Sequence, residues 1–196
     1  MSRERADDYD QKIKAILDAA AVLFARTGYP GAKLQDVAKA CGASKSMLYH
    51  YFPTKDDLLF AMLKEHLEGT ILSAQEAIFA EEKPEKQFVS FVNAFLHRSA
   101  HSRRRHIVAM NDMKFLPKSL QKPLLELERK ILVLIADLLR QIKPGLAEDV
   151  YKPYAMLLLG MLNWTDTWFS SSGPMKTADL CERASRLFLR GFLAER

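Results

Sequence analysis

The sequence is poor in cysteine, with only Cys41 and Cys181 among its 196 residues. The two lie far apart along the chain and match no metal-ligand or redox spacing. The first residues, MSRERADDYDQK, are also charged where a signal peptide would be apolar, so we expect no signal peptide. We therefore expect a protein of the reducing cytoplasm.

Long apolar runs are absent as well. The two most apolar stretches, ILVLIADLL and YAMLLLGMLNW, are interrupted by Asp137 and Asn163. Both fall well short of the ~20 apolar residues that a membrane-spanning helix needs, so we expect no membrane segment. The alternating pattern of strands is missing too, and nearly every segment has helical period. Because 48% of the residues are hydrophobic, a sizeable core is expected, and the sequence predicts an all-α protein with about nine helices in total.

The first fifty-odd residues predict three helices. Asp10 is a suitable N-cap for the first, which ends near Gly28 and Pro30. The second is expected over 34–41 and stops at Gly42, which tolerates the left-handed backbone of a tight turn. The third is capped by Ser44 and stops before Pro53. Two short helices joined by a glycine turn are typical of the helix-turn-helix motif.

The segment CGASKSMLYHYFPTK has the chemistry of a DNA-reading helix. Short side chains near the start of the third helix let its backbone approach a groove, and hydroxyl, amine and imidazole groups donate to bases and phosphates. Between Pro30 and Lys55 the chain has four lysines and one acidic residue, Asp36, within a protein of net charge +5. A small packing unit with a solvated basic face is the alternative interpretation.

The stretch LQDVAKACGASKSMLYHYFPTKDDLL resembles the N-terminal domain of TetR-type transcriptional repressors. The resemblance covers roughly residues 10–60 and includes the Cys-Gly-Ala-Ser turn, the Leu-Tyr-x-x-Phe run and Lys55. It implies that Tyr49 and Lys55 contact phosphates, that Lys45 and Ser46 approach base edges, and that Lys55 begins a fourth helix linking DNA to ligand. The expected DNA-binding residues are Lys33, Gln35, Ser44, Lys45, Ser46, Tyr49, His50 and Lys55.

One position departs from the family pattern. The family usually has Thr or Ser as N-cap of the second helix, whereas this chain has Lys33, with Asp36 three residues later. Losing such a cap typically costs about 1 kcal/mol, because a lysine cannot accept the unpaired N–H groups. Lys33 either contacts a phosphate or is a solvated lysine.

The remainder of the chain reads as a larger helical domain. Helices are expected at 56–82, 85–101, 103–115, 119–142, 148–171 and 176–194, separated by Pro84, Pro117, Pro144 and the SSSGP loop. We therefore expect an N-terminal arm (1–9), a helix-turn-helix domain (10–55) and an effector-binding and dimerisation domain (56–196).

Pockets in helical domains are lined by apolar and aromatic residues with a few polar groups. The candidate ligand-binding residues of this kind are Phe91, Phe95, Met110, Met113, Phe115, Asn163, Trp164 and Trp168. Most of them also suit an ordinary core. The two tryptophans share a helix face, which is more typical of packing or a subunit interface.

A basic stretch, HRSAHSRRRH, is the other unusual feature. It is either a solvated helix end or an anion site built on Arg103, Arg104 and Arg105, because guanidinium groups bind phosphate bidentately. Such a site would suit an acyl-coenzyme A, and GMLNWTDTWFSSSGP resembles TetR-type repressors that respond to such thioesters. His97 and His101 have a possible metal spacing but no third ligand nearby, so we expect no metal and no cofactor.

No catalytic motif can be placed, so we expect no enzyme. A single helix-turn-helix reads few bases, so a homodimer on a palindromic operator is expected. Its interface is expected to involve Leu157, Leu158, Met161, Leu180, Ala184, Leu187 and Phe188. The predicted function is a ligand-responsive repressor of double-stranded operator DNA, released by a small hydrophobic effector. The alternatives are a regulator without an effector, or a helical lipid carrier or enzyme with a vestigial DNA-binding domain.

Overall fold

The structure, a computed structural model, describes residues 2–195, with side chains described from Tyr9 onward. In this part of the chain it forms nine α-helices and one short 3-10 helix and contains no strand, so the predicted all-α class is confirmed. Among these helices, none combines the length and the apolar character of a membrane span. The chain divides into two compact units, one of residues up to 66 with 104–124, the other of residues 67–103 with 125 onward.

The first unit begins with a long helix, α1 (Ser2–Gly31). The prediction that Asp10 caps this helix is wrong, because helical residues precede it as far as Ser2 and Asp10 lies inside α1. The added turns include two arginines, a glutamate and an alanine, which all favour helices. Gly28 breaks the regular helix with a φ of 70°, and the chain makes one more turn through Pro30 before α2.

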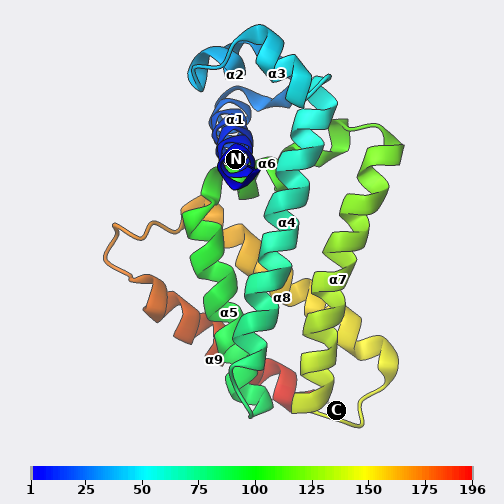
Figure 1. The fold of residues 1–196 in the computed structure, drawn as a ribbon. Helices are drawn as coiled ribbons and strands as arrows, with labels where there is room; N and C mark the ends of the chain where they lie inside the picture. The colour runs from blue at the N-terminus through cyan, green and yellow to red at the C-terminus, as the bar shows by residue number, and fades with distance from the viewer. Residues whose placement is uncertain (1, 196) are drawn as a thin grey trace. The chain divides into compact units, whose positions relative to one another are not determined.

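The helix-turn-helix follows as predicted. α2 (Leu34–Ala40) and α3 (Lys45–Tyr51) are joined by a turn in which Gly42 has a φ of 68°. Ser44 caps α3, since its Oγ accepts the Met47 N–H at 3.1 Å. Val37 and Leu48 are fully buried and hold the two helices together. Figure 1 shows α2 and α3 one after the other at the top of the view, above α1.

Three further helices contribute to the first unit: the start of α4 (Lys55–Phe79), α6 (Arg103–Asp112) and the start of α7 (Lys118–Ile142). A single helix was predicted over 103–115, but the structure ends α6 at Asp112 and continues as the 3-10 helix η1 (Met113–Phe115). The tighter turn is closed by the Leu116 N–H, which donates to the Met113 carbonyl at 3.1 Å before Pro117 ends the segment.

The second unit contains α5 (Pro84–His101), α8 (Glu148–Trp168) and α9 (Thr177–Ala194), with the later parts of α4 and α7. α5 packs against both α8 and α9. Its core is aromatic, because Phe88, Phe91, Tyr151 and Phe192 are all almost completely buried. α8 ends at Trp168, three residues earlier than expected, because its last N–H bond is the one from Phe169 to the Thr165 carbonyl.

Candidate nucleic-acid interface and ligand pocket

The outward face of α3 is polar and accessible. Ser44, Lys45, Ser46 and His50 are exposed, and Tyr49 is 39% exposed although it is aromatic. Leu48 occupies the opposite face and is completely buried. The period of α3 therefore separates a core face from a face rich in hydrogen-bond donors.

Three contacts of aromatic rings shape this face. The Lys45 Nζ lies 5.7 Å from the centre of the Tyr49 ring, so both side chains cover the same outer surface of α3. At the end of α3, the Tyr51 ring contacts Tyr9 of α1 and His50, at centroid distances of 5.1 and 5.5 Å. The contact with Tyr9 ties the outer turns of α1 to α3.

The residues at the start of α2 that are expected to bind DNA are exposed as well. Lys33 and Gln35 both reach solvent, and Lys33 makes no side-chain cap for α2. The missing cap predicted from the sequence is therefore confirmed. Seven of the eight expected DNA-binding residues are exposed.

Lys55, the eighth, is different because it is half-buried and its ammonium points into the protein. Its Nζ donates to the carbonyl of Tyr29 at 2.8 Å and to that of Ala32 at 3.1 Å, and it lies 4.2 Å from the centre of the Tyr29 ring. The sequence pattern gave no signal for this contact, since the partners are 26 and 23 residues apart.

Tyr29 contacts several other elements of the first unit. Its hydroxyl donates to the Asp56 carboxylate in a short hydrogen bond, and its backbone N–H donates to Asp112 Oδ2 at 3.2 Å. Burial, together with the hydrogen bond to Asp56, raises the pKa of Tyr29 well above its usual range. Asp112 is only 6% exposed, and burial raises the pKa of its carboxyl as well. A carboxylate of α6 therefore completes the backbone hydrogen bonding of α1.

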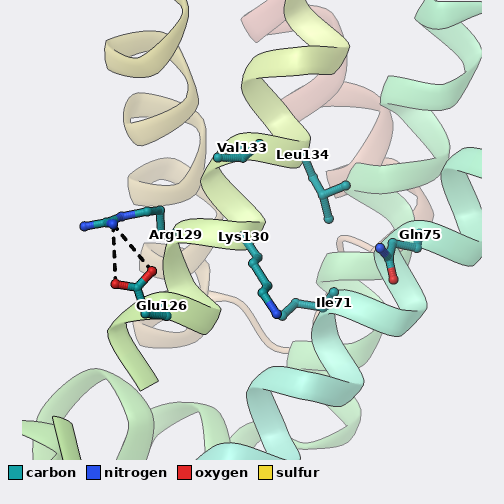
Figure 2. Close-up of a pocket in the computed structure, with 7 residues that line it drawn as sticks. All are labelled: Ile71, Gln75, Glu126, Arg129, Lys130, Val133 and Leu134. Carbon is teal, nitrogen blue, oxygen red and sulfur yellow. Dashed lines mark hydrogen bonds and ion pairs between the residues drawn. The ribbon is translucent and has the colours of Figure 1, made fainter. Parts of the chain in front are cut away.

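The second unit has an open pocket of about 290 Å³ between α4 and α7. Figure 2 shows Ile71 and Leu134 on its walls, with Lys130 extending toward Ile71. Arg129 turns away and pairs with Glu126 at 3.4 Å. Gln75 and Val133 complete the lining. The pocket thus combines an apolar wall with one inward-reaching cation.

None of the expected ligand-binding residues lines this pocket. Met110, Met113 and Phe115 belong to the first unit, where the Phe115 ring stacks on Tyr29 at a centroid distance of 6.1 Å. The other expected residues belong to the second unit: Phe91 and Phe95 are buried on α5, while Asn163, Trp164 and Trp168 lie on α8. The pocket residues were missed because they carry the ordinary pattern of an amphipathic helix.

The three consecutive arginines have separate environments. Arg105 donates to Asp18 at 2.8 Å and to Glu65 at 2.6 Å, and its side chain is only 12% exposed. Arg103 donates to the Asp166 backbone carbonyl at 2.7 Å, whereas Arg104 is exposed. The two carboxylates at Arg105 compete with any anionic ligand. In the described residues no group of three or more His, Cys, Asp or Glu side chains is placed to hold a metal ion.

The outer face of α8 carries a stripe of exposed apolar residues. Met156, Gly160, Trp164 and Trp168 follow one another at four-residue intervals, and Leu157 lies beside them. Trp164 is 67% exposed and Leu157 66%. Of the other residues expected at a dimer interface, Leu187 is exposed, Met161 and Phe188 are half-buried, and Leu158, Leu180 and Ala184 are buried within the chain.

Comparisons with known proteins match both parts of the chain. The profile of bacterial regulatory proteins of the tetR family matches residues 16–62, and the tetracyclin repressor-like C-terminal domain profile matches residues 81–192. A TetR-family transcriptional regulator from Bordetella parapertussis 12822 is 34% identical with a TM-score of 0.86, over 94% of this chain and 97% of that one.

Two further proteins are similar over different extents. The regulator FadR from Bacillus subtilis, solved in complex with stearoyl-CoA, has a TM-score of 0.76 at 21% identity, covering 91% of this chain and 98% of that one. The regulator RutR of Escherichia coli (strain K12) is 38% identical over 65 residues, which are 33% of this chain and 31% of RutR. The first curated matches thus cover a third of the relatives' length or less. Because the two family profiles together span most of the sequence, the chain belongs to the TetR family, whose members are DNA-binding transcriptional regulators and not enzymes.

Proposed function

We propose that this regulator is a repressor that binds a palindromic operator as a homodimer and is released by a small amphipathic effector. The observation that carries the proposal is the outward face of α3, where exposed Ser46, Lys45 and Tyr49 project from a helix anchored by Leu48. Lys45 and Ser46 would approach base edges, and Tyr49 would contact a phosphate. The exposed Lys33 and Gln35 would support the docking from α2.

The stripe on α8 supports the dimer. Monomeric soluble proteins rarely leave large contiguous apolar surface in water, and two adjacent tryptophans in such a stripe are typical of interfaces. A second copy that covers Leu157, Trp164 and Trp168 would bury them and place two α3 helices on one duplex. On this proposal the tryptophans line the interface and not a ligand site.

The pocket between α4 and α7 supports an effector with an apolar chain and an anionic group. Ile71 and Leu134 offer the apolar wall, and Lys130 offers a positive charge. An acyl-coenzyme A has this combination, and stearoyl-CoA is the ligand in the FadR structure. The pocket would hold part of such a molecule, and the rest would extend from its open side.

Release would follow from unequal binding to two states of the dimer. The free dimer would match the half-site spacing of the operator, and the liganded dimer would hold its α3 helices at another separation. A coupling of ~1–3 kcal/mol changes DNA affinity by ~5- to 150-fold, which is sufficient for repression and release.

The test is a gel-shift titration on the DNA upstream of the chain's own gene, with competitor DNA and with stearoyl-CoA, stearate or free coenzyme A. We expect a specific complex that stearoyl-CoA releases, and release that requires more ligand in Lys130→Ala. Lys86→Ala, at an exposed lysine of α5, is the matched control.

Each negative result has a separate meaning. A specific complex that none of the three compounds changes would contradict the thioester effector and favour a regulator without one. The absence of any specific complex would contradict the repressor and favour the carrier alternative.

A further inference from the structure

The Lys55 ammonium is fully engaged by backbone carbonyls. Besides the Tyr29 and Ala32 carbonyls at 2.8 and 3.1 Å, the Pro30 carbonyl lies 3.5 Å from Nζ. A lysine ammonium has three N–H donors, so each of them has an acceptor here. A phosphate would have to displace at least one of these carbonyls to bind Lys55.

These carbonyls lie at and just beyond the end of α1, where the Tyr29 carbonyl also accepts the Ala32 N–H at 3.3 Å. Gly28 breaks α1 at a φ of 70° just before them. The last carbonyls of a helix have no partner within the helix and carry its negative dipole end, so a cation at this place is stabilising. Lys55 therefore acts as a C-terminal cap supplied by another helix.

The same segment leads directly into α2. Ala32 precedes Lys33, the N-cap position of α2, where no side-chain hydrogen bond closes the helix. The start of α2 consequently depends on how the turn before it is held. Two consecutive residues of α4 hold that turn: Lys55 binds its carbonyls, and Asp56 accepts the hydroxyl of Tyr29.

We propose that Lys55 is a positioning residue for DNA binding, which fixes the turn before α2 against α4 and does not contact a phosphate. This role rests on the DNA-binding function of the first unit and departs from the phosphate contact that the family resemblance implies. Loss of Lys55 would weaken DNA binding through a displaced α2, although no DNA contact is removed.

The first test is lysine acetylation of the native protein, followed by mass spectrometry, with and without generic duplex DNA at low salt. Lys55 is expected to react about tenfold more slowly than Lys39 or Lys45 in the free protein, because its amine must first leave charge-assisted hydrogen bonds. DNA is expected to protect Lys45 and to leave Lys55 unchanged. Rapid reaction of Lys55 in the free protein, or added protection by DNA, would overturn the proposal.

The second test is the salt dependence of duplex binding by Lys55→Met, measured at a temperature where circular dichroism shows the variant folded. We expect several-fold weaker binding, a lower melting temperature and an unchanged salt slope. Lys45→Ala is expected to lower the slope by about 1, as a lost phosphate contact does. A slope lowered by about 1 in Lys55→Met at an unchanged melting temperature would refute the positioning role.

The two tests also separate this inference from the DNA-binding function. If DNA protects none of the exposed lysines, the failure lies in the nucleic-acid interface. The reactivity of Lys55 in the free protein still decides whether its ammonium is held by the turn, even if Lys55→Met does not fold.

Discussion

A single tyrosine links three helices of the DNA-binding unit. Tyr29 uses its ring, its hydroxyl, its N–H and its carbonyl for four different partners: Phe115, Asp56, Asp112 and Lys55. The N–H needs its partner because Gly28 interrupts the helix just before it. A buried N–H without an acceptor is costly, so loss of the Asp112 carboxylate that accepts it should destabilise the fold.

Asp112→Ala should lower the free energy of unfolding by about 1–3 kcal/mol, because it leaves the buried Tyr29 N–H without an acceptor. Asp112→Asn keeps an amide oxygen at the same place and removes the buried charge. We therefore expect it to be at least as stable as the native protein at pH 7. Urea unfolding of both variants measures the difference, and equal losses in the two would contradict the acceptor role.

The pH dependence of that difference follows from the pKa of Asp112. Burial raises this pKa in the fold above its ordinary value of 3.8, so the folded chain holds the proton more tightly than the unfolded chain. The ionised carboxylate thus costs stability at neutral pH, and the cost declines as the pH falls through the folded pKa. The advantage of Asp112→Asn should therefore shrink on acidification, and an advantage that grew would contradict this sign.

At the scale of elements, the turn between α2 and α3 sets the orientation of α3, the helix that we propose contacts the bases. Gly42→Ala should lower the free energy of unfolding by about 1–2 kcal/mol, because alanine is strained at a φ of 68°. An added Cβ would meet no atom within 4 Å, so the cost is backbone strain alone. Thermal melting of Gly42→Ala and of the native protein measures this loss of stability.

Gly191→Ala is the matched control for this substitution. Gly191 also has open space around it but lies within α9, where alanine favours the helix by about 1 kcal/mol. The two alanines should therefore change the melting temperature in opposite directions. A stabilised Gly42→Ala would contradict the strained turn.

The proposed role of the exposed apolar stripe on α8 as a dimer interface can be tested by placing a charged residue in it. If the stripe is the proposed dimer interface, Leu157→Arg should convert the proposed dimer to a monomer in sedimentation experiments, because it would place a charge in a desolvated interface. Both tryptophans of the chain lie in the stripe, so their emission should shift to longer wavelength at the same time. Leu72→Arg, at an exposed leucine of α4, should leave both readings unchanged. A dimeric Leu157→Arg would contradict this interface.

How much the sequence predicts depends on the range of the interaction. The limits of α2 and α3 follow from Gly42, Ser44 and Pro53, which act on their immediate neighbours, and the outward face of α3 follows from its period. The start of α1 was misplaced because Asp10 is an adequate cap that the chain does not use. An uninterrupted run of helix-forming residues needs no cap at that position.

On the scale of the whole molecule, the missed features are contacts between distant segments. Asp112 and Tyr29 are 83 residues apart, and nothing in either local pattern indicates that they meet. The same holds for the Lys55 cap and for the pocket between α4 and α7. The three consecutive arginines show the opposite: their local pattern is distinctive, but it does not correspond to one shared site. Arg105 forms ion pairs, Arg103 contacts a backbone carbonyl and Arg104 is exposed to solvent.

The most direct test of the account is a DNase footprint on the DNA upstream of the chain's own gene, with excess competitor DNA. The native protein and Lys39→Ala should both protect one pseudo-palindromic site, with half-sites ~34–36 Å apart, whereas Lys45→Ala should require a markedly higher concentration. Lys39 is an exposed lysine of α2 and controls for charge alone. No protected site, or equal footprints for Lys45→Ala and the native protein, would contradict the reading of DNA by α3.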